Sequence, residues 1–305
     1  YCIKDCVLCL DLMKKLSIIP NNIGMANVCN VPISYIFLRG QGVKVNSIVV
    51  KTCNENDILI PTLKNFDPDK ENDTGFEGAI VLDPEERKTT GIYLEDPIAV
   101  VDYASLYPSS IIEKNLSHET FICTKKEYDL NPNKYKNIFE NLKINEITYD
   151  DFNYIKKSEK TTEKVKADTQ TTCYFKSQFQ DNSKEMKLGI LPIVLNTLLS
   201  ERKATKKRLK DAKDENQKKV LDGLQLAYKV TANSCYGQMG ARTSSIYLKN
   251  IAACTTAIGR EQIHIAESGA REWVKTQDND LIYDDDVDKM LEVVYGDSVL
   301  HDTPL

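Results

Sequence analysis

The sequence lacks several features that would place it in other classes of protein. Its 305 residues contain no apolar run near the roughly 20 residues of a membrane span, so we expect no membrane partner. The first residues, Tyr1 to Asp5, do not resemble a signal peptide and include no initiator methionine, which indicates a fragment of an intracellular protein. Histidine is scarce, and the separation of His118, His264 and His301 argues against a histidine-based metal site.

A basic net charge is also absent. The formal net charge is −5 and the pI is about 5.5, unlike those of small basic DNA-binding modules, although a local basic stripe can still serve a nucleic acid. Nine cysteines without a secretory signal indicate free thiols in a reducing compartment. Cys2, Cys6 and Cys9 fit one face of a helix. Zinc is the less favoured alternative there, because no second Cys or His pair completes four ligands nearby.

The remaining composition is ordinary for a globular protein. With 41% hydrophobic and 28% charged residues, the chain can form one or two domains with a sizeable core. Apolar residues at helical spacing predict a helix over residues 1–19, followed by Pro20 and a turn at residues 21–24. The polar residues 64–75 predict a loop, and residues 76–84 predict a strand that ends in a turn.

A pair of antiparallel helices is expected in the second half of the chain. Residues 125–187 are polar and predict only loops and short elements with little chemistry. Gly189 then starts a long helix, whose apolar stripe is Leu191, Val194, Leu195 and Leu198. Residues 213–217 indicate the tip between the helices, and Gly237 fits the end of the second one. The apolar stripe of the second helix is Val220, Leu224, Ala227 and Val230.

Asp102 is the first candidate for chemistry. It follows residues 97–101, a β-branched run that predicts a buried strand, and Pro108 is expected to end this strand and open a helix over residues 109–114. A carboxylate beside a tight turn suits a divalent cation, because hard cations prefer carboxylate and carbonyl oxygens. Taken alone, the pattern fits a surface aspartate after an edge strand equally well.

Polar stripes on the two predicted helices are the second candidate. Arg202 and Lys206 share a face of the first helix, and Lys229, Asn233 and Tyr236 share a stripe of the second. If the helices pack antiparallel, both stripes could face one cleft, where two cations and an amide suit a triphosphate. Three other lysines of the first helix are interpreted as a solvated face: Lys203, Lys207 and Lys210.

A third candidate lies near the end of the chain. Val293 and Val294 predict a strand, Gly296 begins a turn, and Asp297 is thereby a second carboxylate delivered at a turn. The acidic run 284–286 is interpreted as a solvated loop.

Three motifs in this order resemble those of the family B DNA-dependent DNA polymerases, the group of the eukaryotic replicative enzymes and of many large DNA viruses. The motifs are Asp102-x-x-Ser105-Leu106-Tyr107-Pro108-Ser109, Lys229-x-x-x-Asn233-Ser234-x-Tyr236-Gly237 and Tyr295-Gly296-Asp297. The resemblance covers residues 1–297 and is closest to the enzymes of algal viruses. Smaller matches support it: Glu77-Gly78-Ala79 resembles a DNA-binding element of the family, with Phe76 in place of its tyrosine, and Tyr1-x-x-x-Asp5 resembles the last motif of the 3′→5′ exonuclease.

The resemblance implies an α/β (α+β) right-hand fold, with a palm sheet that holds Asp102 and Asp297 and a fingers helix pair. The thumb and nearly all of the exonuclease are absent from this chain. The implied segments are the end of the exonuclease domain (1–20), a connector or N-terminal-domain segment (21–74), the first part of the palm (75–188), the fingers (189–240), the second part of the palm (241–297) and the start of an intein (298–305).

The implied reaction is attack of a primer 3′-hydroxyl on the α-phosphate of a dNTP, assisted by two Mg²⁺ ions. By resemblance, Asp102 and Asp297 bind metal, and Leu106 offers its carbonyl to the metal or its amide to the triphosphate. Tyr107 would lie under the sugar and reject ribonucleotides. The remaining assignments are Arg202, Lys206, Lys229 and Asn233 on the triphosphate and Tyr236 beside the nascent base pair.

The implied partners are primer–template DNA and dNTPs, with a sliding clamp as a further candidate. For a viral enzyme, the implied location is the host nucleus or a cytoplasmic virus factory. A fragment without a thumb and with half of the metal site is not expected to extend primers.

The third motif departs from the family pattern Tyr-Gly-Asp-Thr-Asp-Ser, because Ser298 and Val299 follow Asp297 and the second aspartate is missing. We favour an intein that begins at Ser298, whose Oγ would attack the carbonyl of Asp297 in an N-to-O acyl shift. The alternative is a true loss of the aspartate, which would leave a catalytically inactive, polymerase-like DNA-binding protein. An unrelated helical nucleotide-binding protein would require three ordered motifs to arise by coincidence.

Overall fold

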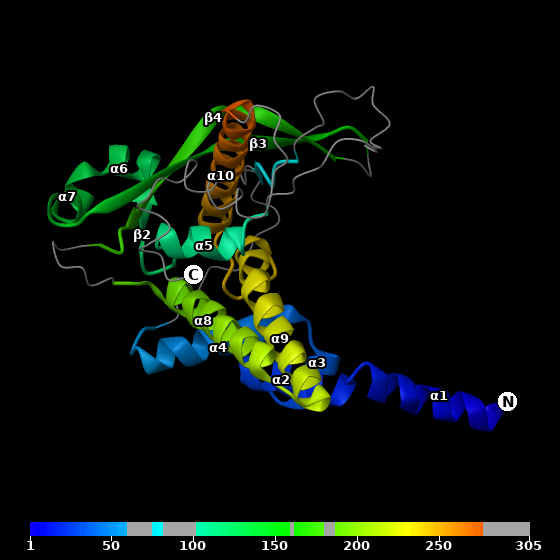
Figure 1. Ribbon diagram of the computed structural model, residues 1–305. Helices are drawn as coiled ribbons and strands as arrows, with labels where there is room; N and C mark the ends of the chain where they lie inside the picture. Colours follow the sequence, from blue (N-terminus) through cyan, green and yellow to red (C-terminus); the bar gives the residue numbers. More distant parts are fainter. Residues whose placement is uncertain (60–74, 82–101, 159–161, 180–186, 277–305) are drawn as a thin grey trace.

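The computed structural model describes residues 1–59, 75–81, 102–158, 162–179 and 187–276 (Figure 1). No helix in these ranges has the length and apolar character needed to cross a membrane. The elements in chain order are α1 (Cys2–Lys15), α2 (Ile18–Cys29), α3 (Ile33–Leu38), α4 (Gln41–Glu55), β1 (Gly75–Phe76), α5 (Leu106–Glu113), β2 (Phe121–Thr124), α6 (Lys125–Leu130), α7 (Pro132–Asn141), β3 (Ile144–Lys156), β4 (Thr162–Lys176), α8 (Ile190–Asp211), α9 (Glu215–Gly240) and α10 (Lys249–Thr276).

The sheet has four antiparallel strands in the order β1-β3-β4-β2, dominated by the long β3–β4 hairpin. The prediction of only loops and short elements for residues 125–187 is therefore wrong. The hairpin looks polar because only one of its faces is buried: Tyr149 and Phe175 point into the core, whereas the hydroxyls of Thr148 and Thr172 are hydrogen-bonded at 2.9 Å on the exposed face.

The core combines buried side chains of α2, α4, α5, α8, α9 and α10 with those of β3 and β4. The predicted stripe of α8 is buried, as expected for a helix with one apolar face. Helix α10 packs against β3, and the Tyr149 hydroxyl donates to Asn250 Oδ1 across this contact at 3.2 Å. The first turns of α10 are enclosed on all sides, with Ile251, Ala252 and Cys254 fully buried.

Helices α8 and α9 form the expected antiparallel pair, seen crossing the lower part of Figure 1. Asp214 at the tip caps α9 by accepting from the Gln217 N–H at 2.9 Å. The end predicted at Gly237 is wrong, because α9 continues to Gly240 and buries Met239. Val220 is exposed rather than part of the buried stripe, which instead consists of Leu221, Ala227, Thr231, Ala232, Cys235 and Met239.

The N-terminal region differs from its prediction in one respect. Helix α1 is present but ends at Lys15, and after Ser17, with a φ of 49°, the chain enters α2. Pro20 and the supposed turn 21–24 lie inside α2, because proline in a first turn removes no helical hydrogen bond. Helix α1 extends away from the rest of the chain and buries none of its residues (Figure 1).

All nine cysteines are free thiols, as predicted, and Cys2, Cys6 and Cys9 are exposed. The described residues contain no group of three or more His, Cys, Asp or Glu placed to hold a metal ion.

The region before the first motif is only partly described. Strand β1 ends at Phe76, so the strand predicted over 76–84 is wrong for residues 77–81. Helix α5 is confirmed but begins at Leu106, with Pro108 in its first turn. Several predictions lie outside the described residues: the loop 64–74, the strand 97–101, the acidic run 284–286, Asp297 and Ser298.

Candidate active site

Helix α5 begins four residues after a carboxylate side chain. Asp102 is exposed, and Ser105 precedes the helix with a φ of 61°. Leu106 and Tyr107 are the first two helical residues, so their N–H groups have no carbonyl partner in an earlier turn. Such groups, with the positive end of the helix dipole, favour an anion. The Leu106 carbonyl, in contrast, accepts the Ser110 hydroxyl at 2.8 Å, which leaves its amide as the better contact for a ligand.

Tyr107 joins α5 to α9 and α10. Its ring centroid lies 4.6 Å from that of Tyr236, at an interplanar angle of 41°. The Tyr107 ring also meets Gly259 of α10, where an added Cβ would lie 2.8 Å from Tyr107 Cε1. Burial raises the pKa of both phenols, and the nearby Arg260 charge opposes this only partly. Both rings therefore stay neutral near pH 7.

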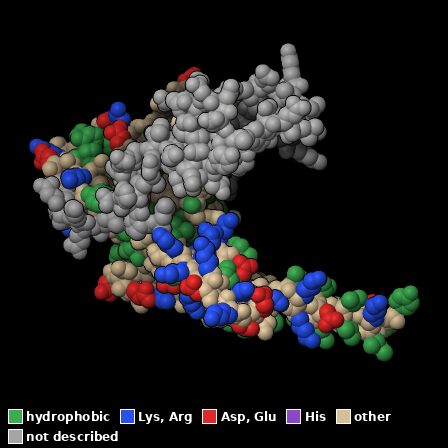
Figure 2. All heavy atoms as spheres, viewed as in Figure 1, with side chains coloured by type: hydrophobic (Ala, Val, Ile, Leu, Met, Phe, Trp, Pro, Cys, Tyr) green, Lys and Arg blue, Asp and Glu red, His purple; other side chains and the backbone are tan. Residues whose placement is uncertain are grey.

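The polar stripes of α8 and α9 approach each other. Arg202 Nε donates to Gln225 Oε1 of α9 at 3.4 Å, and Gln225 lies one turn before Lys229. Lys206, Lys229 and Asn233 are exposed, so their polar ends are accessible. Figure 2 shows Lys and Arg side chains gathered over this helix pair. The arrangement gives a basic surface that continues into the Tyr236 end of α9.

Helix α10 contributes residues that the sequence interpretation missed. Arg260 Nη1 donates to the carbonyls of Glu77 and Gly78 at 3.1 and 2.9 Å, and its Nε lies 3.2 Å from Glu77 Oε2. The Thr256 hydroxyl donates to the same Glu77 carbonyl at 2.9 Å. These bonds explain why residues 77–79 leave the sheet. The sequence feature that could have identified Arg260 is its position directly after a run of small and apolar residues.

Two residues after Arg260, the Gln262 carbonyl accepts the Tyr103 hydroxyl at 2.9 Å. The same stretch of α10 therefore supports both the first motif and the segment 77–79.

The predicted exonuclease residues are not brought to this centre. Tyr1 and Asp5 lie on α1, which extends away from the other helices (Figure 1). Asp297 lies outside the described residues, so among those described Asp102 is the one carboxylate expected to bind metal. A single carboxylate is too few for the oxygen ligands that Mg²⁺ requires, so the pairing of Asp102 with Asp297 stays a prediction.

Comparisons with known proteins show the family to which the chain belongs. The family profile described as DNA polymerase family B matches residues 31–304. The DNA polymerase of Pyramimonas orientalis virus is 42% identical, over 93% of this chain and 25% of the viral protein. The DNA polymerase delta catalytic subunit of Dictyostelium discoideum is 36% identical, over 86% of this chain and 20% of that protein.

A solved structure has the same fold. The family B DNA polymerase from the hyperthermophilic archaeon Pyrobaculum calidifontis matches with a TM-score of 0.52 and 21% identity, over 86% of this chain and 28% of that one. The mixed helix and sheet fold is thus similar to that of a solved family B DNA polymerase, as expected. The chain belongs to DNA polymerase family B, and the resemblance to algal virus enzymes is confirmed. It spans 25% of the length of the viral relatives.

Proposed function

We propose that this chain is the catalytic-core segment of a longer polymerase that performs template-directed DNA synthesis. The observation that carries the proposal is the contact between Tyr107 and Tyr236, which unites the first and second motifs at the start of α5. A nucleotide held there would have the N-terminal amides of α5 on one side and the basic surface of α8 and α9 on another.

Each side chain then has a defined role. The amides of Leu106 and Tyr107, together with four side chains, bind the triphosphate and the leaving pyrophosphate: Arg202, Lys206, Lys229 and Asn233. Tyr107 excludes a ribose 2′-hydroxyl by its bulk, and Tyr236 borders the new base pair. The segment Glu77, Gly78 and Ala79, fixed by Arg260, contacts DNA.

Metal ions would supply further charge neutralisation at the reacting phosphate, since family B polymerases depend on divalent metals. We assign Asp102 and Asp297 to two Mg²⁺ ions. In the longer polymerase, Tyr1 and Asp5 belong to the exonuclease segment (1–20). The palm is formed by 75–188 and 241–297 and the fingers by 189–240. The partners are primer–template DNA, dNTPs and a sliding clamp, in the host nucleus or a cytoplasmic virus factory.

Primer extension by the longer polymerase tests this function. The wild-type enzyme should extend a primer in a template-dependent manner, and Tyr107→Ala should admit ribonucleotides. Lys203→Ala, on the exposed face of α8, is the control and should keep sugar discrimination. A wild-type enzyme without template-dependent extension would refute the function, and unchanged sugar discrimination in Tyr107→Ala would refute the role of this ring. The 305 residues alone should not extend primers.

A second candidate is an inactive, DNA-binding relative, because Asp297 is followed by Ser298 and not by Thr-Asp. The gene sequence beyond Leu305 separates the two. An intein body that ends in His-Asn, followed by Thr-Asp-Ser, would restore the metal site by splicing. Direct continuation without a second aspartate would favour the inactive protein.

A further inference from the structure

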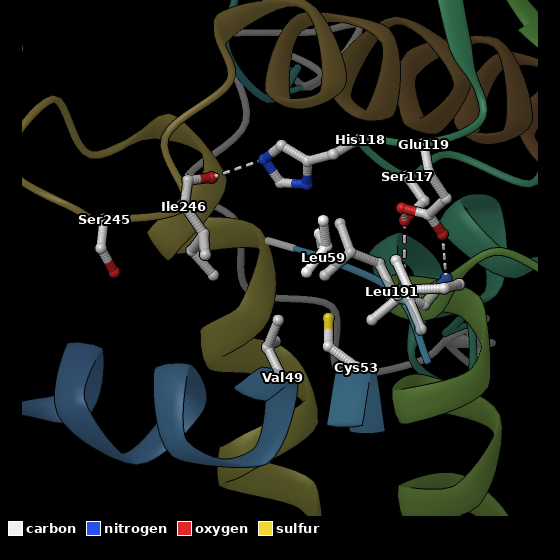
Figure 3. A pocket seen from close by; sticks show the side chains of 11 residues that line it. Val49, Cys53, Leu59, Ser117, His118, Glu119, Leu191, Ser245 and Ile246 are labelled. Atoms are coloured by element: carbon white, nitrogen blue, oxygen red, sulfur yellow. Dashed lines mark hydrogen bonds between the residues drawn. The ribbon is translucent and has the colours of Figure 1, made fainter. Parts of the chain in front are cut away.

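The first turn of α8 is held by side chains from another part of the chain. Asn115 Oδ1 accepts the Gly189 N–H at 2.8 Å, Glu119 Oε1 accepts the Ile190 N–H, and Ser117 Oγ accepts the Leu191 N–H at 3.2 Å. Figure 3 shows Ser117 and Glu119 above this turn. Three successive N–H groups that a helix start leaves unpaired are thus satisfied by residues 115–120, which we call the anchor loop.

The anchor loop is itself fixed. Asn115 is 1% exposed, adopts a φ of 54°, and donates to the carbonyls of Lys176 and Lys187 at 3.0 and 3.2 Å. Ser117 Oγ donates to Glu119 Oε2 at 2.8 Å, and Ser117 N donates to Thr120 Oγ1 at 2.9 Å. These bonds tie the end of α5, the end of β4 and the start of α8 into one junction.

The junction is closely packed around Gly189. A Cβ at this position would lie 2.7 Å from Ser117 Cβ and 2.8 Å from both Glu119 Oε1 and Thr120 Cγ2. Only glycine allows the loop to approach the helix start so closely. The contact is therefore a specific fit and not a solvent-exposed cap.

The junction connects two parts of the proposed nucleotide site. The anchor loop directly follows α5, whose first turn carries Leu106 and Tyr107, and α8 carries Arg202 eleven residues after Leu191. At about 1.5 Å per residue, Arg202 lies about 17 Å along the helix, so a tilt of about 10° would displace it by about 3 Å. Such a displacement breaks a hydrogen bond to a phosphate.

We propose that Asn115, Ser117 and Glu119 are positioning residues for the incoming nucleotide. They fix the first turn of α8 relative to α5, and thereby hold Arg202 and Lys206 at the correct distance from the site beside Tyr107. This inference rests on the proposed polymerase function, because the nucleotide contacts belong to that function.

Variants of Glu119 in the longer polymerase test the proposal. Glu119→Ala should raise the KM for dNTP about tenfold, because the start of α8 loses an ionised acceptor, while the Kd for primer–template stays near the wild-type value. Glu119→Gln keeps an oxygen acceptor, so its KM for dNTP should lie close to the wild-type value. Ser117→Ala removes one weaker bond and should raise the KM by a smaller factor.

A matched control is available on another helix. Glu127 also caps a helix, but locally: its carboxylate, inside α6, accepts the N–H of the N-cap residue Thr124 at 2.7 Å, and α6 carries no proposed site residue. Glu127→Ala should therefore leave the KM for dNTP unchanged. An equal rise in Glu127→Ala, or folded Glu119→Ala and Ser117→Ala enzymes with wild-type KM, would overturn the proposal.

Amide hydrogen exchange separates this inference from the function itself. In the 305-residue chain, Glu119→Ala should speed exchange of the Ile190 and Leu191 amides at least about tenfold, whereas Glu127→Ala should not. Unchanged exchange in Glu119→Ala would show that Glu119 does not hold the start of α8, even if the polymerase is active. Faster exchange in a protein without polymerase activity would instead refute the proposed function and leave the anchor as a structural junction.

Discussion

The rings of Tyr107 and Tyr236 lie in contact, with centroids 4.6 Å apart and planes inclined by 41°. This distance and tilt fall within the favourable range for aromatic pairs. Tyr107 lies in the first turn of α5, and Tyr236 lies on the polar stripe of α9. The contact therefore fixes the distance between two of the sequence motifs, and Gly259 of α10 also limits the position of Tyr107.

Gly259→Ala should displace Tyr107. The new methyl group would lie 2.8 Å from Tyr107 Cε1, so the ring must shift or rotate. We expect a loss of stability of about 1–3 kcal/mol, typical of overpacking, and weaker ribonucleotide exclusion in the longer polymerase. Urea unfolding of the chain and ribonucleotide incorporation measure the two effects.

Gly237→Ala is the control for helix propensity. Gly237 lies inside α9, and a Cβ there would meet no atom within 4 Å. Alanine should stabilise the helix by about 0.5–1 kcal/mol. If Gly259→Ala also stabilises the chain, the packing of Tyr107 against α10 is not tight.

Arg260 should stabilise the segment 77–79 mainly through backbone carbonyls. Its side chain is 12% exposed, whereas that of its ionic partner Glu77 is 40% exposed. Arg260→Met would leave two carbonyls without this donor and should cost about 2–3 kcal/mol in urea unfolding. Glu77→Gln removes only a partly exposed ion pair and should cost less than about 1 kcal/mol.

DNA binding gives a second measurement of the Arg260 contacts. If residues 77–79 contact DNA, Arg260→Met should weaken primer–template binding by the longer polymerase, and Arg260→Lys should recover part of it. If Glu77→Gln loses as much stability in urea unfolding as Arg260→Met, then the ion pair, and not the carbonyl bonds, holds this segment.

The thiols of the chain should divide into two groups by their reactivity toward a thiol reagent. Cys2, Cys6 and Cys9 are exposed on α1, and the other six are buried. Burial raises the pKa of Cys123 to about 11 and of Cys235 to about 12, which disfavours the reactive thiolate. A thiol reagent should therefore modify three cysteines rapidly in the native chain and all nine in denaturant. Rapid modification of Cys235 in the native chain would contradict the packing of α9.

The sequence predicted helices better than strands, for a physical reason. The stripe of α8 repeats every three to four residues and faces one core, so its period identified the helix and its buried residues. The β3–β4 hairpin buries one face, and its exposed face is rich in Lys, Thr and Asn, so composition hid its alternation. Helix α9 passes through Gly237 because burial of Met239 offsets the weak helix propensity of glycine.

The candidate site was predicted where residues follow one another in a motif. Tyr107, Lys229 and Tyr236 belong to such motifs, whereas Arg260 and Glu119 act on backbone groups far away in the sequence. A hydrogen bond to a carbonyl or amide places no demand on the partner's side chain. Contacts of this kind leave no pattern in a single sequence, and they required the structure.

His118 should make the chain sensitive to acid. Its imidazole lines an apolar pocket of about 200 Å³ with Val49, Cys53 and Leu191, and its Nε2 lies 3.1 Å from the Ile246 carbonyl (Figure 3). Burial lowers its pKa below the ordinary 6.5, although the carbonyl and the nearby Glu119 oppose this shift. The neutral ring, with Nε2 as a donor, is therefore the form that the fold favours.

The sign of the effect follows from proton binding. As the pH falls below about 6.5, His118 gains a proton in the unfolded chain before it does so in the folded chain, so the free energy of unfolding decreases. The decrease continues down to the lowered folded-state pKa, with a limiting slope of about 1.4 kcal/mol per pH unit, and it is absent above neutral pH. Urea unfolding at pH 7.5 and pH 5.5 should show a steeper loss for the wild-type chain than for His118→Gln. His264→Gln, which removes an exposed imidazole, is the control and should keep the wild-type acid sensitivity. Parallel losses in wild type and His118→Gln would mean that the imidazole takes up a proton equally well in both states, and that the pocket admits water.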